Sequence, residues 1–252
     1  MSSTGDEPAA VAVDDLTKSY GDTVALRDIS VSVDSGEFVS VVGHSGCGKS
    51  TLLRVLAGLE PEFEGRATVD GTDVRDEGSE RVGMVFQEPR LLPWKSVREN
   101  IAVGLPRGVD PDSEAAQERV DSLIDRVGLS GFADARPSEL SGGMAQRVSL
   151  ARGLAYDPTV MLLDEPFSAL DALTKYEQQD FLLDLWRDSD LTVVLVTHDV
   201  EEAAYLSDRV VVLGGQPGTV ETTVDIAEDR PRERGEWLVG YRDRITTALG
   251  VE

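Results

Sequence analysis

The chain has 252 residues, of which 40% are hydrophobic, and these values suit one large domain, or a core domain with an attached subdomain, and argue against a mainly disordered protein. A net charge of −23 argues against general affinity for nucleic acid, which needs a basic surface. Because Cys47 is the only cysteine, an intrachain disulfide is excluded.

The acidic excess predicts adaptation to a high-salt cytoplasm. At about 1 M salt the Debye length falls to roughly 3 Å, so most surface repulsion disappears. An acidic protein of ordinary origin remains the alternative. Residues 1–10 are polar and acidic, which predicts a disordered leader and no signal peptide. No run approaches the roughly 20 apolar residues of a spanning helix, so a cytosolic chain is expected, with any membrane role coming through a partner.

The first part of the chain predicts strands. Segments rich in β-branched residues alternate with turns at Gly21 and Gly36. These segments are residues 11–16, 25–33 and 37–43. A helix should begin at about Lys49 and end near Gly58, followed by short strands over residues 66–69 and 81–86.

From about residue 88 to 145 the pattern changes to helices. Ala116, Val120, Leu123, Ile124 and Val127 are spaced for one apolar helical face. This pattern predicts a helical subdomain inserted in a core that runs over residues 11–229.

Strands and helices alternate after that segment. The predicted helices are residues 145–156, 172–187 and 200–206, and the predicted strands are 160–164 and 192–197. Two strands that are apolar throughout indicate a parallel sheet covered on both faces. The fold class is therefore α/β: a P-loop NTPase core with a mixed sheet, parallel in its core and antiparallel at the N-terminal strands. A charged tail over residues 230–252 should hold a final helix.

A phosphate-binding loop stands between a predicted strand and a predicted helix. Its residues fit G-x-x-x-x-G-K-[ST] and are Gly43, His44, Ser45, Gly46, Cys47, Gly48, Lys49 and Ser50, with Thr51 following. Glycines let backbone N–H groups converge on phosphates, and the helix N-terminus adds partial positive charge. Lys49 should reach the β- and γ-phosphates of ATP, and Ser50 should ligate Mg²⁺.

Two acidic residues supply the second half of the predicted site. Asp164 and Glu165 end the apolar segment "VMLLD", at the edge where open α/β sheets bind ligands. Asp164 would hold Mg²⁺ through water, and Glu165 would activate the attacking water as general base. An acidic strand-end turn is the alternative interpretation.

Ser141, Gly142 and Gly143 open a later helix and form a second anion-binding terminus. With this "LSGGM" segment, residues 11–215 resemble the ATP-binding cassette (ABC) ATPases. The resemblance implies a head-to-tail homodimer, or pseudo-dimer, in which the signature motif of one subunit contacts the ATP held by the other. Met144 departs from the commonest form, which has glutamine, although serine and backbone amides provide the anion contacts.

Other landmarks of the family occur in order. Tyr20 matches the aromatic that stacks on adenine, with a buried core aromatic as the alternative. Gln87 matches the residue that senses Mg²⁺ and the lytic water, Asp171 the loop at the dimer interface, and His198 the switch histidine at the γ-phosphate.

A chain of this family without membrane spans resembles the separate motor subunit of an importer, peripheral on the cytoplasmic face of the membrane. The partners implied are a membrane-spanning permease and, indirectly, an extracytoplasmic solute-binding protein. Residues 91–94, "LLPW", are a candidate docking surface, or else part of the core of the subdomain. The "LLPW", "PGTV" and "RPRER" segments resemble the nitrate, sulfonate and taurine import group. A soluble ABC ATPase in cofactor assembly remains the alternative, whereas a small-molecule P-loop kinase leaves residues 140–144 unexplained.

Overall fold

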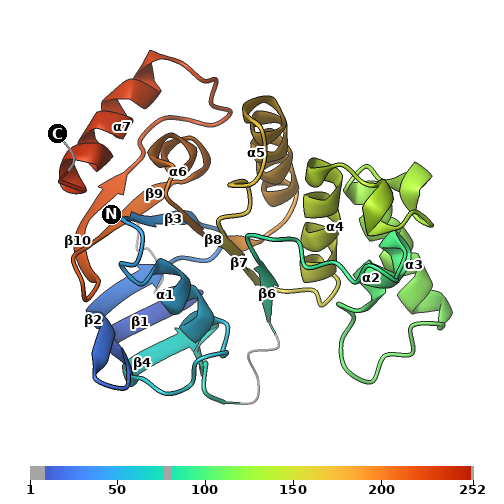
Figure 1. Cartoon of the computed structure of the whole chain (residues 1–252), viewed down its shortest axis with the longest axis horizontal. Helices are drawn as coiled ribbons and strands as arrows, with labels where there is room; N and C mark the ends of the chain where they lie inside the picture. The colour runs from blue at the N-terminus through green and yellow to red at the C-terminus, as the bar shows by residue number, and fades with distance from the viewer. Residues whose placement is uncertain (1–8, 77–80, 251–252) are drawn as a thin grey trace, which may run out of the picture. The chain divides into compact units, whose positions relative to one another are not determined.

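The computed structural model describes residues 9–76 and 81–250. The predicted leader lies almost entirely outside these described residues. The chain divides into two compact units, residues 1–79 with 190–252 and residues 80–189. Each unit is described separately below, with the elements labelled in Figure 1.

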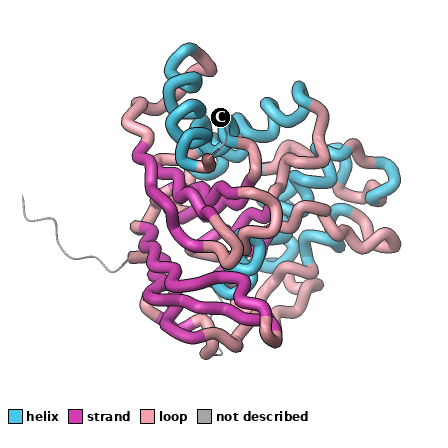
Figure 2. The backbone as a smooth tube through the Cα atoms, turned by 60° about the vertical axis from the view of Figure 1, so that its left-hand side comes forward, coloured by secondary structure: helices cyan, strands magenta, loops and turns pink. Residues whose placement is uncertain are grey.

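The first unit contains an antiparallel sheet with strand order β2-β1-β4-β5. All strands of the chain are drawn in magenta in Figure 2. The strands are β1 (Val11–Tyr20), β2 (Thr23–Val33), β4 (Glu64–Val69) and β5 (Thr72–Asp73). The β1–β2 hairpin turns at two residues, with Gly21 at φ 57°. Glycine adopts this left-handed conformation without strain, so it sets the register that pairs Tyr20 with Thr23.

The same unit also holds strands in the order β10-β9-β3-β8. They are β3 (Phe38–Gly43), β8 (Thr192–Thr197), β9 (Arg209–Gly214) and β10 (Thr219–Asp225), with helices α1 (Lys49–Leu56), α6 (Val200–Leu206) and α7 (Glu236–Ala248). β3 runs parallel to both β8 and β9, and every residue of β3 and β8 is buried. Burial on both faces explains why both strands are apolar nearly throughout.

The second unit contains a parallel strand pair and a group of helices. The pair is β6 (Val82–Val85) and β7 (Val160–Asp164). The helices are α2 (Val97–Ala102), α3 (Glu114–Arg126), η1 (Ser130–Phe132), η2 (Pro137–Glu139), α4 (Gly142–Leu154) and α5 (Ala172–Arg187). The predicted apolar face of α3 is buried.

The predicted α/β class, with parallel and antiparallel strands, is confirmed. One helix begins earlier than predicted, since α4 starts at Gly142 and not at Ala145. The Ser141 hydroxyl accepts a hydrogen bond from the Met144 N–H at 3.3 Å, so it caps a first turn that contains two glycines. Within the described ranges, no helix combines the length and the apolar character needed to cross a bilayer.

The arginines of the "RPRER" segment fasten the C-terminal tail to the end of α6. Arg232 is 6% exposed, and its guanidinium donates to the Ser207 carbonyl at 2.6 Å and to several other carbonyls nearby. Arg230 donates to the Leu206 carbonyl at 2.6 Å and to the Asp208 carboxylate. Cations suit the C-terminus of a helix because its last carbonyls lack partners within the helix.

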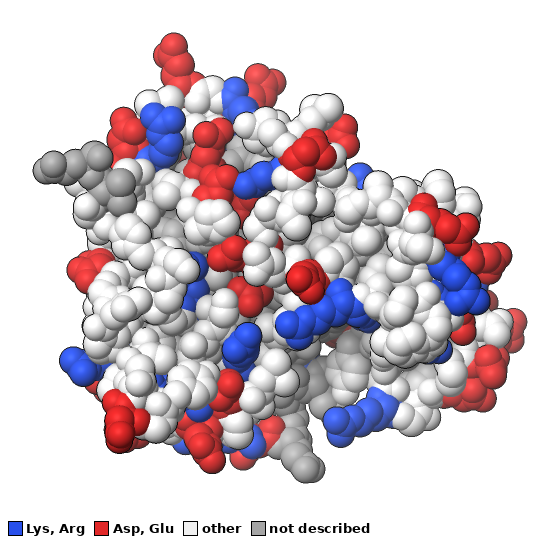
Figure 3. All heavy atoms as spheres, in the orientation of Figure 1, with Lys and Arg blue, Asp and Glu red and all other residues white. Residues whose placement is uncertain are grey.

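Charged side chains are mixed over the face shown in Figure 3, where Lys and Arg lie among the more numerous acidic groups. This distribution keeps large patches of one sign from forming on that face.

Candidate functional site

The phosphate loop lies between β3 and α1 in the first unit. Gly48 precedes the helix at φ 97°, and a Cβ atom there would stand 2.5 Å from Leu26 Cδ2 and 2.9 Å from the Ala25 carbonyl oxygen. Only glycine therefore fits this position without strain. Gly48 has no side chain with which to cap α1, and the first N–H groups of a helix point back toward the residues that precede it, as anion binding requires.

Lys49 is 6% exposed and curls back over the loop that precedes it. Its ammonium donates to the Gly43 carbonyl at 2.8 Å and to the His44 carbonyl at 3.1 Å. These contacts hold one positive charge at the loop. Cys47 is 1% exposed, and burial raises the pKa of its thiol, which therefore stays protonated at neutral pH and fills space.

A turn that the sequence analysis did not assign to the site supports the phosphate loop. Gly218, between β9 and β10, donates its N–H to the Ala25 carbonyl at 3.0 Å. A Cβ at Gly218 would lie 1.9 Å from the Cys47 carbonyl oxygen. The only signal in the sequence was the "PGTV" segment, which the resemblance associated with an import group.

His44 is part of the phosphate loop, and His198 follows the strand that pairs with β3. His198 follows β8 directly, and β8 pairs with β3 so that Thr197 stands opposite Val42. His198 and Gly43 thus leave the carboxyl ends of neighbouring parallel strands, where α/β proteins bind ligands. The His44 Nε2 atom lies 2.9 Å from the Leu249 carbonyl oxygen just after α7.

Tyr20 ends β1 and is 44% exposed, which contradicts the interpretation as a buried core aromatic. Its strand is tied to the phosphate loop through β2, because Leu26 pairs with Lys18 of β1 and approaches Gly48. The aromatic ring and the phosphate loop therefore belong to one connected structure within the first unit.

The second unit brings together the acidic residues and Gln87. Asp164 is buried at the end of β7, and Glu165 follows at φ 45°. A left-handed conformation is unusual outside glycine and is typical of functional sites. Because Val85 of β6 pairs with Leu163 of β7, Gln87 leaves the same edge of this strand pair.

Ser168 connects these residues and was not singled out in the sequence. Its hydroxyl donates to the Glu165 carbonyl at 3.0 Å and accepts from the Gln87 amide at 3.0 Å. The serine thus links the predicted base to the predicted sensor of Mg²⁺ and water. Its only signal in the sequence was its place in "SALD", the segment that ends in Asp171.

The signature segment packs against the start of α5 in the same unit. A Cβ at Gly143 would stand 2.9 Å from Thr174 Cγ2, so glycine permits this approach, while Gly142 faces Leu170. Asp171 caps α5 by accepting from the Leu173 and Thr174 N–H groups at 3.2 and 3.1 Å. Hydrogen bonds from Thr174 are the main reason that the pKa of Asp171 is lowered.

The family model described as ABC transporter matches residues 26–168, a range that includes the phosphate loop, Gln87, the signature segment, Asp164 and Glu165. This chain belongs to the ABC transporter family. The predicted family of ABC-type ATPases is thereby confirmed.

Curated relatives within the ABC transporter family align over most of their length. Aliphatic sulfonates import ATP-binding protein SsuB 1 of Xanthomonas axonopodis pv. citri (strain 306) is 51% identical, covering 86% of each chain. The protein of the same name from Pseudomonas savastanoi pv. phaseolicola (strain 1448A / Race 6) is 52% identical, covering 88% of each. An uncharacterized ABC transporter ATP-binding protein, MJ0412 of Methanocaldococcus jannaschii, is 47% identical over 95% of this chain and 91% of its own.

Solved structures support the same fold. The ATP-binding cassette MJ0796, in a dimeric post-hydrolysis state bound to ADP and Pi, is 32% identical with a TM-score of 0.74. The match covers 87% of this chain and all of that one. CbiO1 from Clostridium perfringens, part of the ABC transporter complex cbiONQ, is 28% identical with a TM-score of 0.78, over 87% and 90% of the two chains.

Proposed function

We propose that this chain is the ATP-hydrolysing motor subunit of an ABC importer whose solute is an aliphatic sulfonate. The observation that carries the proposal is the 51–52% identity, over most of both chains, to two proteins named for aliphatic sulfonate import. Nitrate and taurine, which the sequence resemblance also allowed, are not named by these relatives. Cofactor assembly, the alternative from the sequence, receives no support from them.

The first unit supplies groups that bind ATP phosphates. Backbone N–H groups at the start of α1 and the Lys49 ammonium match the negative charge of a triphosphate. His198 would contact the γ-phosphate, and Tyr20 would stack on the adenine. Ser45, Gly46 and Thr51 complete the loop that surrounds the phosphates.

The second unit supplies groups for the chemical step. Glu165 would accept a proton from the attacking water as general base, and Gln87 would orient that water. Ser168 holds both residues through hydrogen bonds at 3.0 Å. This proposal assigns binding mainly to one unit and proton transfer to the other.

Mg²⁺ fits the chemistry of the three proposed ligands, because Ser50 offers a hydroxyl, Asp164 a buried carboxylate and Gln87 an amide oxygen. Among the described residues, no three His, Cys, Asp or Glu form a cluster that could hold a metal. A hydroxyl, a carboxylate and an amide oxygen are a typical donor set for Mg²⁺, which takes few protein ligands and several phosphate oxygens. The ion would supply positive charge to the phosphates during hydrolysis.

A homodimer is the proposed working form. A protein with a similar structure is a dimer with ADP and Pi bound. Ser141, Gly142 and Gly143, with Asp171, would contact the ATP held by the other subunit. In the isolated chain Ser141 already accepts a bond from Met144, so the serine would share its hydroxyl between its own helix and the phosphate.

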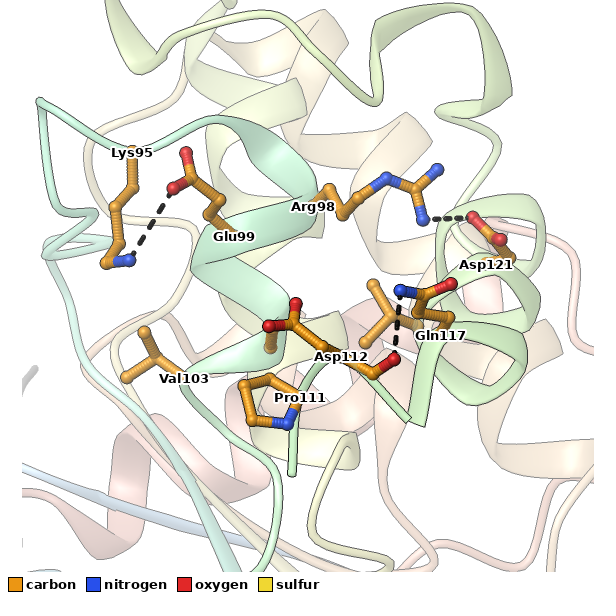
Figure 4. A pocket seen from close by; sticks show the side chains of 10 residues that line it. Lys95, Arg98, Glu99, Val103, Pro111, Asp112, Gln117 and Asp121 are labelled. Atoms are coloured by element: carbon orange, nitrogen blue, oxygen red, sulfur yellow. Dashed lines mark hydrogen bonds and ion pairs between the residues drawn. The ribbon is translucent and has the colours of Figure 1, made fainter. Parts of the chain in front are cut away.

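The proposed permease contact is in the second unit. Trp94 is 65% exposed, and a nearby cavity of about 750 Å³ lies between α2 and α3 (Figure 4). Its rim carries the ion pairs Lys95–Glu99 and Arg98–Asp121. Buried Asn100 fixes the backbone before α2 through four hydrogen bonds. A partly apolar concavity suits a short helix of a membrane-embedded partner. With that partner, the chain would be peripheral on the cytoplasmic face of the membrane. A solute-binding protein would contact the permease and would act on this chain only indirectly.

The test is a deletion of the gene, followed by growth on alkanesulfonate, taurine or sulfate as sole sulfur source, and on nitrate as sole nitrogen source. Taurine is an aliphatic sulfonate that carries an amino group, so the alkanesulfonate used is ethanesulfonate, which lacks that group. We expect growth to fail on ethanesulfonate and to return with the wild-type gene but not with Glu165→Gln. Failure on taurine alone would narrow the proposed solute to taurine, and failure on nitrate alone would replace it. Normal growth in every medium would contradict import of these solutes.

Salt adaptation, suggested by the net charge of −23, stays a prediction. Raising KCl from about 0.1 M to about 1 M shortens the Debye length from about 10 Å to 3 Å and should raise the unfolding temperature. An unfolding temperature that does not rise would contradict it.

A further inference from the structure

Lys18 in β1 is a buried cation with several partners. Its side chain is 3% exposed, which is rare for lysine unless the charge is paired. The ammonium donates to the Glu62 carbonyl at 2.7 Å and lies 3.0 Å from a carboxylate oxygen of Glu60. It also stands 4.9 Å from the centroid of the Tyr20 ring.

Lys18 and Tyr20 are two residues apart in β1, whose pairing with β2 shifts register between Lys18 and Ser19, and the Lys18 ammonium lies over the Tyr20 ring. An ammonium over a ring, within about 6 Å of its centroid, is attracted by the negative charge of the π-face. One face of Tyr20 is thereby covered by the ammonium, while the side chain as a whole stays 44% exposed. A base that stacks on Tyr20 would use the exposed part of the ring.

The other partners of Lys18 belong to the segment that follows α1. Glu60 and Glu62 stand shortly after Leu56, the last residue of the helix that begins at the phosphate loop. The hydrogen bond from Lys18 is the main reason that the pKa of Glu60 is lowered, with a smaller contribution from Tyr20. One ammonium thus joins the aromatic ring to the segment that directly follows the helix of the phosphate loop.

We propose that Lys18 is a positioning residue for the nucleotide base: it fixes the Tyr20 ring at the distance from the phosphate helix that adenine and triphosphate require together. Glu60 assists by holding the ammonium in place. This inference rests on the proposed role of Tyr20 in stacking on adenine. It assigns to Lys18 no contact with the nucleotide.

The competing interpretation is that Lys18 only stabilises the segment after α1. The two interpretations differ in which ligand is affected. Loss of ring positioning weakens the binding of a nucleotide that has a base, whereas general loosening of the loop weakens every triphosphate. Inorganic tripolyphosphate, which has no base, separates them.

The experiment compares the dissociation constants of ATP and tripolyphosphate by calorimetry, in the full chain, for wild type, Lys18→Met and Lys18→Arg. For Lys18→Met we expect ATP to bind about 3- to 30-fold more weakly, the range of one desolvated cation–π contact. Tripolyphosphate should change by less than about 2-fold, and Lys18→Arg should restore most of the ATP affinity because it keeps the cation.

Arg75→Met is the matched control. The Arg75 guanidinium also lies over a ring, 4.7 Å from the centroid of Phe63, and also pairs with a carboxylate, that of Asp73. Its loss should leave both dissociation constants unchanged. If Lys18→Met unfolds, Glu60→Gln provides the second measurement, with a smaller loss of ATP affinity and the same insensitivity of tripolyphosphate.

Two outcomes for Lys18→Met decide against the positioning role. Equal losses for ATP and tripolyphosphate, or an unchanged ATP affinity in Lys18→Met, would overturn the positioning role. Tyr20→Ala is measured alongside. If that variant binds ATP as the wild type does, the proposed stacking role of Tyr20 is wrong, and this failure is distinct from a failure of Lys18 alone.

Discussion

In both units parallel strands lead at their carboxyl ends to predicted site residues, but the residues differ in charge. In the first unit, β3 and β8 are parallel and buried, and they lead to backbone N–H groups, the Lys49 ammonium and His198. In the second, the parallel strands β6 and β7 lead to Asp164, Glu165 and Gln87. One strand edge thus carries donors and positive charge, and the other carries carboxylates.

This difference predicts that substitutions in the two units affect different properties, the affinity for ATP and the rate of turnover. From Gly43 to Thr51 the phosphate loop contains no acidic residue, although the whole chain carries 47 Asp and Glu. Groups that attract phosphate set the affinity for ATP, whereas a general base acts on water in the transition state. Changes in the first unit should therefore weaken binding, and changes in the second should slow turnover.

The largest expected effect is that of Glu165→Gln. Removing a general base slows catalysis by about 10²- to 10⁴-fold. ATP binding should persist, because glutamine keeps the shape of the side chain and removes a negative charge. Steady-state phosphate release and ATP titration measure the two quantities, with Glu118→Gln at an exposed position of α3 as a control for loss of an acidic charge. Wild-type turnover in Glu165→Gln would mean that another group activates the water.

Lys49→Ala should change binding instead. The ammonium donates to two carbonyls of its own loop and would donate to phosphate oxygens, and hydrogen bonds that involve charge contribute about 1.5–3 kcal/mol. ATP should therefore bind about 10- to 100-fold more weakly. If titration shows unchanged affinity while turnover falls, the division of roles between the two units is wrong.

Gly48→Ala tests the loop geometry with a smaller effect. At φ 97° an alanine is strained, and its Cβ would meet Leu26 Cδ2 at 2.5 Å. We expect the free energy of unfolding to fall by about 1–3 kcal/mol, measured by denaturant titration. Gly71→Ala is the matched control, because Gly71 has φ 75° and nothing within 4 Å of the added Cβ. A loss in Gly48→Ala no larger than in Gly71→Ala would show that Leu26 yields easily.

Local patterns in the sequence predicted much of this comparison. The bounds predicted for α5 and α6 agree with the structure, since Asp171 and Asp199 are strong N-caps just before each helix. The phosphate loop was equally readable, because its residues are contiguous. The early start of α4 was missed, because Gly142 and Gly143 have low helix propensity while Ser141 compensates as a cap.

Contacts between distant segments could not be predicted in this way. Ser168 meets Gln87 across 81 positions, and Lys18 meets Glu62 across 44. Gly218 reaches the phosphate loop only because β9 pairs with β3. Hydrophobic periodicity fixes which face of an element is buried, but the partner of a polar side chain depends on packing that no single segment encodes.

The smallest expected effect concerns the helix cap in the second unit. The folded-state pKa of Asp171 is lowered, mainly by hydrogen bonds from Thr174, below the value of about 3.9 of an unfolded chain. A carboxylate of this kind stabilises the fold above the unfolded pKa, and the stabilisation is lost as the pH falls through the lower, folded pKa. The difference in unfolding temperature between wild type and Asp171→Asn, which keeps a capping oxygen, should therefore be constant from pH 5 to 7 and shrink below about pH 4. Ser141→Ala is the contrast, because a serine cap does not titrate and its cost should not depend on pH. A difference that persists unchanged to pH 2 would mean that the charge of Asp171 plays no part in the cap.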